Sequence, residues 1–175
     1  MCKMLFIGTK NELQEIPLDA SYPDFYLEKI SGEFLPIKQT FTNQNIYFVG
    51  TSRGCSCDLG IQSNKLDPTL FEQTPPIQNL LNKFRKVSGT LDEWKKRHQE
   101  KVDNAIETQE NYLTQTFKLV DILLNETNKG NTVEIFCVWA GDYDTTPDFN
   151  DTIDTKKIDL RENFKIVEKE FTTFV

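Results

Sequence analysis

The sequence predicts an α+β fold, with a single layer of about five mostly antiparallel strands packed against two or three helices, one of them long. Short apolar runs bounded by turn-forming residues lie towards both ends of the chain, and the stretch between the third and fourth runs has a helical pattern. This order argues against a repeated βαβ fold with a parallel sheet. With 175 residues, 38% of them hydrophobic, the chain is expected to form one domain over residues 1–175.

Five segments are predicted as strands, because β-branched, aromatic and other apolar residues fill short runs that end at glycine, serine or polar residues. They cover residues 4–7, 25–30, 45–49, 133–139 and 164–175. The fourth segment is apolar on both alternating faces except at Glu134, which predicts either a central strand covered on both sides or a strand packed against a partner. In the last segment the alternation slips between Ile166 and Val167, which predicts a bulge.

Two helices are predicted between the third and fourth strands. The first covers residues 75–87, where apolar residues recur at helical spacing before Ser88 and Gly89 end the pattern. The second covers residues 90–127 and begins with a Thr-x-x-Glu capping box formed by Thr90 and Glu93. Its first half is polar on most sides, so the pattern fits either one helix or two.

Three other stretches are less regular. Residues 34–41 fit either one helical turn or an extended link, and the aspartate-rich residues 141–154 are predicted as a solvated loop. Residues 50–60 contain three glycines and two cysteines, which predicts a loop whose backbone makes turns that other residues resist. The single histidine, His98, lies in a charged stretch of the long helix and is expected at the solvated surface.

The charge of the chain narrows the classes of partner. It carries 27 acidic and 20 basic residues, a formal net charge of −7, and a negative surface repels the phosphates of nucleic acids and anionic lipids. We therefore expect no nucleic acid and no membrane as a partner, whereas a basic protein would suit this surface. No signal-peptide core or membrane-length apolar run is visible, so the chain is expected to be cytoplasmic with reduced thiols.

The cysteines of the glycine-rich loop are the most specific chemical signal. Cys55 and Cys57 are two residues apart, so an extended backbone would direct both thiols to one side, and Cys2 opens the first predicted strand. If that strand runs antiparallel to residues 45–49, the three sulfurs converge. Thiolates bind zinc, but a closed structural site has four ligands, and the spacing here is Cys-x-Cys rather than the more specific Cys-x-x-Cys. The alternative is that these cysteines are buried as small apolar residues.

Two further kinds of site are considered for the same region. Removal of Met1 would expose the thiol of Cys2 beside a free amine, as in N-terminal nucleophile hydrolases, but their fold stacks two large sheets and this chain offers too few strands. The loop could also bind an anion or another ligand through its backbone N–H groups with help from Arg53, although it lacks the ending of a P-loop. Cys137 lies in the most apolar strand and is expected in the core.

Three blocks of sequence resemble a family of small bacterial proteins to which no activity is assigned. The blocks are Met1-Cys2 with the following strand, Val-Gly-x-x-x-Gly-Cys-x-Cys from Val49 to Cys57, and residues 133–141, together about a quarter of the chain. The resemblance implies a bacterial, cytosolic protein and draws attention to Cys2, Cys55 and Cys57 without giving them roles.

The sequence therefore supports two functional hypotheses. The first is a cysteine-centred site of Cys2, Cys55 and Cys57 that binds a metal, zinc being the candidate, or that carries redox or thiol chemistry. The second is an acidic, non-enzymatic protein that binds a basic partner, as an immunity or adaptor protein does. Whether the chain is an enzyme, and what its oligomeric state is, the sequence leaves open.

Overall fold

The computed structural model describes residues 2–18, 25–51, 54–60 and 91–175, and for most residues between 91 and 110 it describes the backbone alone. The chain divides into two compact units, one of Met1–Ile61 with Tyr112–Val175 and one of Gln62–Asn111. The predicted helix at residues 75–87 and the candidate ligand contact Arg53 lie outside the described residues. The first unit holds the whole sheet, and the prediction of a single domain stays a prediction.

Six strands form one sheet in the order β2-β3-β1-β4-β6-β5. Their bounds are β1 Lys3–Thr9, β2 Tyr26–Lys29, β3 Asn45–Gly50, β4 Val133–Trp139, β5 Phe149–Ile153 and β6 Glu170–Phe174. All neighbouring strands are antiparallel except β5 and β6, which are parallel. The predicted α+β fold with a mostly antiparallel sheet is therefore confirmed, with six strands rather than about five.

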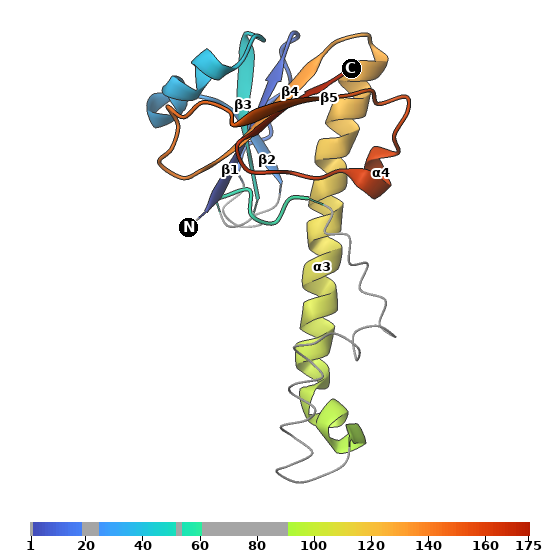
Figure 1. Cartoon of the computed structure of the whole chain (residues 1–175). Coiled ribbons are helices and arrows are strands. Elements are labelled where there is room, and N and C mark those ends of the chain that lie inside the picture. The colour runs from blue at the N-terminus through green and yellow to red at the C-terminus, as the bar shows by residue number, and fades with distance from the viewer. Residues whose placement is uncertain (1, 19–24, 52–53, 61–90) are drawn as a thin grey trace. The chain divides into compact units, whose positions relative to one another are not determined.

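Apolar side chains cover both faces of the sheet. Alternate residues of β1 and β4 enter two separate cores, so Leu5 and Cys137 lie in one core while Phe6 and Phe136 lie in the other. The first core packs against the C-terminal part of helix α3 (Leu91–Asn128), through Leu119, Val120 and Leu123. The second packs against the 3-10 helix η1 (Gly32–Thr40) through the buried Ile37. Figure 1 shows η1 and this part of α3 on opposite sides of the sheet.

The structure resolves two alternatives that the sequence pattern left open. Residues 34–41 belong largely to η1, which is a short 3-10 helix rather than an extended link. The second predicted helix is the single helix α3, which runs from Leu91 to Asn128. Central strand β4 lies between β1 and β6 with buried residues on both faces, as its apolar pattern predicts, and even Glu134 is buried there.

Two elements near the C-terminus differ from the prediction. Part of the stretch predicted as a solvated loop forms the edge strand β5, whose residues are mostly exposed and so lack the alternating pattern of a buried strand. The segment predicted as a last strand with a bulge is preceded by the short helix α4 (Leu160–Asn163), and the strand itself starts only at Glu170. Lys169, just before it, has a left-handed backbone with φ of 58°, which prevents the strand from extending further back.

The pairing of β1 with β3 positions the candidate site. The two strands are antiparallel, with Leu5 opposite Val49 and Thr9 opposite Asn45. The beginning of β1 therefore lies beside the end of β3, where the glycine- and cysteine-rich loop starts. None of the helices in the described parts of the chain carries an apolar stretch long enough to cross a membrane.

Candidate functional site: a cluster of three cysteines

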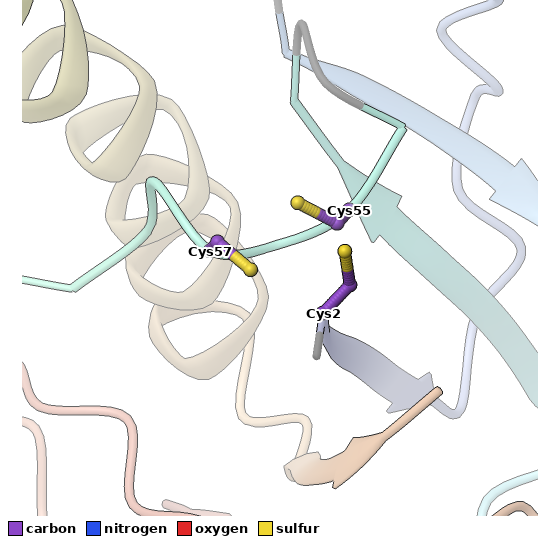
Figure 2. Close-up of side chains that lie close together, drawn as sticks. All are labelled: Cys2, Cys55 and Cys57. Carbon is purple, nitrogen blue, oxygen red and sulfur yellow. The ribbon is translucent and has the colours of Figure 1, made fainter. Parts of the chain in front are cut away.

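Three cysteines from two distant parts of the sequence meet at this end of the sheet. The sulfur atoms of Cys2, Cys55 and Cys57 all lie within 4.8 Å of one another. Cys2 precedes β1, whereas Cys55 and Cys57 belong to the loop after β3, and Figure 2 shows the three side chains turned towards a common space. Cys55 is buried, and Cys2 and Cys57 are exposed. The predicted convergence of the three sulfurs is confirmed.

Ser56 holds the loop against the sheet. Its hydroxyl Oγ accepts a hydrogen bond from the backbone N–H of Leu5 at 2.8 Å and donates one to the carbonyl oxygen of Val49 at 2.5 Å. Leu5 and Val49 are opposite each other in the β1–β3 pairing, so the hydroxyl bridges the two strands where they separate. The backbone N–H of Ser56 also donates to the carbonyl oxygen of Lys3 at 2.8 Å. The segment Cys55–Cys57 therefore replaces β3 as the neighbour of β1.

A tight turn brings the chain back to β1 after β3 ends. Thr51 closes this turn, because both its backbone N–H and its hydroxyl donate to the carbonyl oxygen of Cys55, at 2.9 and 2.8 Å. Its own carbonyl oxygen accepts from the N–H of Gly54 at 2.9 Å. Gly54 has a φ of +67°, in the left-handed region that glycine adopts without steric cost. Cys55 thus has a fixed backbone position one residue later.

Backbone hydrogen bonds also fix the other side of the cluster. The N–H of Ala140, just after β4, donates to the carbonyl oxygen of Cys2 at 2.9 Å. The N–H of Lys3 donates to the sulfur of Cys57 at 3.1 Å. Cys2 is therefore held between the end of β4 and the Cys55–Cys57 segment, and the protein's own hydrogen bonds account for the convergence of the sulfurs.

The proximity of the thiols affects their ionisation. Burial raises the pKa of the Cys55 thiol to about 11, and the neighbouring sulfurs of Cys57 and Cys2 raise this pKa as well, while a hydrogen bond from the Cys57 backbone opposes them. Cys55 is consequently a neutral thiol at neutral pH when only the protein surrounds it. A bound divalent cation would reverse this preference, because a metal deprotonates a coordinating thiol outright.

The spacing of the sulfurs is compatible with a shared metal ion. In a tetrahedral site with Zn–S bonds of about 2.3 Å, the sulfurs are about 4 Å apart, so sulfurs within 4.8 Å would each have to move by less than about 1 Å. A rotation about the Cα–Cβ bond of the two exposed cysteines supplies such a shift. The three cysteines form the only cluster of three or more potential metal-binding side chains within the described residues.

The remaining candidates from the sequence lie elsewhere. Cys137 is buried in the core beside α3, as predicted, and burial raises its pKa to about 12. His98 lies on α3, and its side chain is not among those that the structure describes. An N-terminal nucleophile fold stacks two sheets, whereas the described residues form one, so this alternative gains no support. The roles of Thr51 and Ser56 were not predicted, because only the tertiary structure shows what their hydroxyls bond.

No protein-family model, curated protein or solved structure matches the chain. The geometry of the three cysteines is therefore the basis on which a function can be proposed.

Proposed function

We propose that Cys2, Cys55 and Cys57 bind one transition-metal ion as thiolates, with Zn²⁺ the ion to test first. The observation that carries the proposal is the convergence, at one end of the sheet, of three sulfurs from two distant parts of the sequence, all within 4.8 Å of one another. Thiolate sulfur is the preferred ligand of soft and borderline metals such as zinc. Buried cysteines that merely fill a core have no need of such a cluster, and two of these three are exposed.

The geometry favours metal binding over a redox dithiol. A catalytic dithiol needs an accessible thiol with a lowered pKa, and Cys55, which is buried and has a raised pKa, does not meet this need, so only Cys2 and Cys57 could form such a pair. A disulfide would also engage only two of the three sulfurs. A metal ion uses all three. The proposal places the chain in a reducing compartment such as the cytoplasm, where thiols stay free.

Zinc stoichiometry tests the proposal. The full chain, purified without chelators and reduced, is dialysed against Zn²⁺ and its metal content is measured by mass spectrometry. We expect one zinc per chain, a strong loss in Cys57→Ser, and full retention in Cys137→Ala, which removes the fourth cysteine as a matched control. Absence of bound zinc, or equal zinc in the wild type and Cys57→Ser, would refute the proposal. The acidic surface would then remain as the functional hypothesis, with a basic protein as partner.

A further inference from the structure

The two edges of the sheet differ in how their backbone is covered. The outermost strands are β2 and β5. On β2, Leu27 exchanges two hydrogen bonds with Ile16, at 2.9 and 2.8 Å, and the N–H of Lys29 donates to the carboxylate of Glu15 at 3.0 Å. On the other side, β5 is the last strand of the sheet, and its first four residues are exposed. An uncovered edge presents backbone N–H and C=O groups to a second chain, so β5 is the edge at which another strand can add.

The hydrogen bonds to β6 show which backbone groups of β5 face outwards. The carbonyl oxygen of Ile153 accepts from the N–H of Val175 at 2.9 Å, so Ile153 and, two residues earlier, Asp151 direct their backbone groups towards β6. The alternate residues Asn150 and Thr152 direct theirs away from the sheet. The N–H of Thr152 donates to the side chain of Asp151 at 2.8 Å, in an exposed position. An added strand would replace this local bond and leave the Asp151 carboxylate available to a cation.

The side chains of β5 indicate the chemistry of the partner. Phe149, Asp151 and Ile153 share one face of the strand, because side chains alternate. Phe149 is 49% exposed, and the half-buried Ile153 packs at the margin of the core on the α3 side. Residues 142–154 contain five aspartates and no lysine or arginine, and only one of these aspartates forms an ion pair with a described residue. The edge is therefore acidic, with an apolar side chain on either side of Asp151.

We propose that the outer edge of β5 binds an extended segment of a basic partner protein as an additional strand. The segment carries a lysine or arginine opposite Asp151 and apolar residues opposite Phe149 and Ile153, so that cross-strand pairs of opposite charge and of apolar side chains form on this face. A second copy of this chain fits worse, because pairing through β5 would bring the same aspartates together and like charges opposite each other destabilise a sheet. The inference does not depend on the proposed metal site.

An NMR titration of the ¹⁵N-labelled full chain tests this inference. The probe is the peptide Lys-Thr-Val-Thr-Lys-Thr-Val-Thr-Lys, which has the proposed spacing of lysine and valine. We expect the amide signals of Asn150 and Thr152 to shift and to saturate at one peptide per chain. Asp151→Asn should weaken binding about threefold, as for an exposed ion pair. The matched control Asp142→Asn makes the same change of charge in the loop before β5 and should bind the peptide like the wild type.

Two modified peptides separate strand addition from attraction by charge alone. Both keep every side chain, and they carry N-methyl groups on alternate residues, one on its threonines and the other on its lysines and valines. Only one set of N–H groups can face β5, so one of the two should bind at least about tenfold more weakly than the other. Equal binding of the two peptides would overturn the inference, as would signal shifts centred away from β5 or no binding at millimolar peptide. Dimerisation of the chain without peptide, with shifts at Asn150 and Thr152, would overturn it in favour of a second copy. The wild-type titrations decide the inference even if a variant does not fold.

Discussion

Replacing Ser56 with alanine is expected to destabilise the protein and to weaken metal binding together. The hydroxyl is buried and makes two hydrogen bonds, from Leu5 N at 2.8 Å and to the Val49 carbonyl at 2.5 Å. Its removal leaves a buried backbone donor and a buried acceptor unpaired. At about 1–3 kcal/mol for each unsatisfied group, and with partial relaxation, the expected loss is about 2–4 kcal/mol of unfolding free energy.

Urea denaturation of the metal-free protein measures this loss. Ser31→Ala is the matched control, because Ser31 is exposed at the start of η1 and its side chain makes no capping hydrogen bond. We expect a change below about 0.5 kcal/mol in that variant. Since Ser56 also holds Cys55 and Cys57 beside β1, the zinc affinity of Ser56→Ala should fall about tenfold, equivalent to about 1.4 kcal/mol. A stability loss no larger than that of Ser31→Ala would refute the role given to this hydroxyl.

Three further predictions concern the same unit. Gly50→Ala should lower the unfolding free energy measured in urea by about 3 kcal/mol, because a Cβ there would overlap the ring of Tyr26. Gly54→Ala should lower it by only about 1–2 kcal/mol, because the space there is open and the strain comes from the φ of +67° alone. Equal losses in the two variants would contradict this packing. Burial opposes ionisation of Glu126, but hydrogen bonds from Lys129, Asn131 and Asn11 outweigh it and lower the pKa of that carboxyl from its ordinary 4.5. The stability that Glu126 contributes is therefore present above about pH 4.5 and is lost as the pH falls through the lowered pKa. Glu126→Gln should make the unfolding free energy fall less steeply as the pH is lowered below about 4.5. An unchanged dependence on pH would contradict the role given to the Glu126 carboxylate. Zinc at a hundred times its dissociation constant should raise the unfolding free energy of the wild type by about 2.7 kcal/mol, and that of Cys57→Ser by much less; an equal rise in both would place the zinc elsewhere.

The parts of the fold that could be predicted are those where burial imposes a pattern. Strands β1, β3 and β4 lie in the middle of the sheet, and their runs of apolar residues are buried on both faces. Edge strand β5 is mostly exposed and contains Asn150 and Asp151, so its residues look like a loop. Its pairing with β6 is a tertiary property that no local pattern reports.

In the candidate site, too, one feature could be predicted from the sequence and another depends on the tertiary structure. The meeting of Cys2 with Cys55 and Cys57 could be predicted because antiparallel pairing of two apolar strands places the start of one beside the end of the other. The bridging hydroxyl of Ser56 could not, since a serine between two cysteines has no distinctive pattern. Its position depends on how far β1 and β3 separate, which is set by the turn that Thr51 and Gly54 form.

X-ray absorption spectroscopy at the zinc edge tests the central claim most directly, because it counts the sulfur atoms bonded to the metal. For the zinc-loaded chain in thiol-free buffer we predict three sulfurs at about 2.3 Å. Cys57→Ser should show two, and Cys137→Ala should still show three. A first shell of nitrogen and oxygen, or a sulfur count that does not fall in Cys57→Ser, would contradict the assignment of Cys2, Cys55 and Cys57 as the metal ligands.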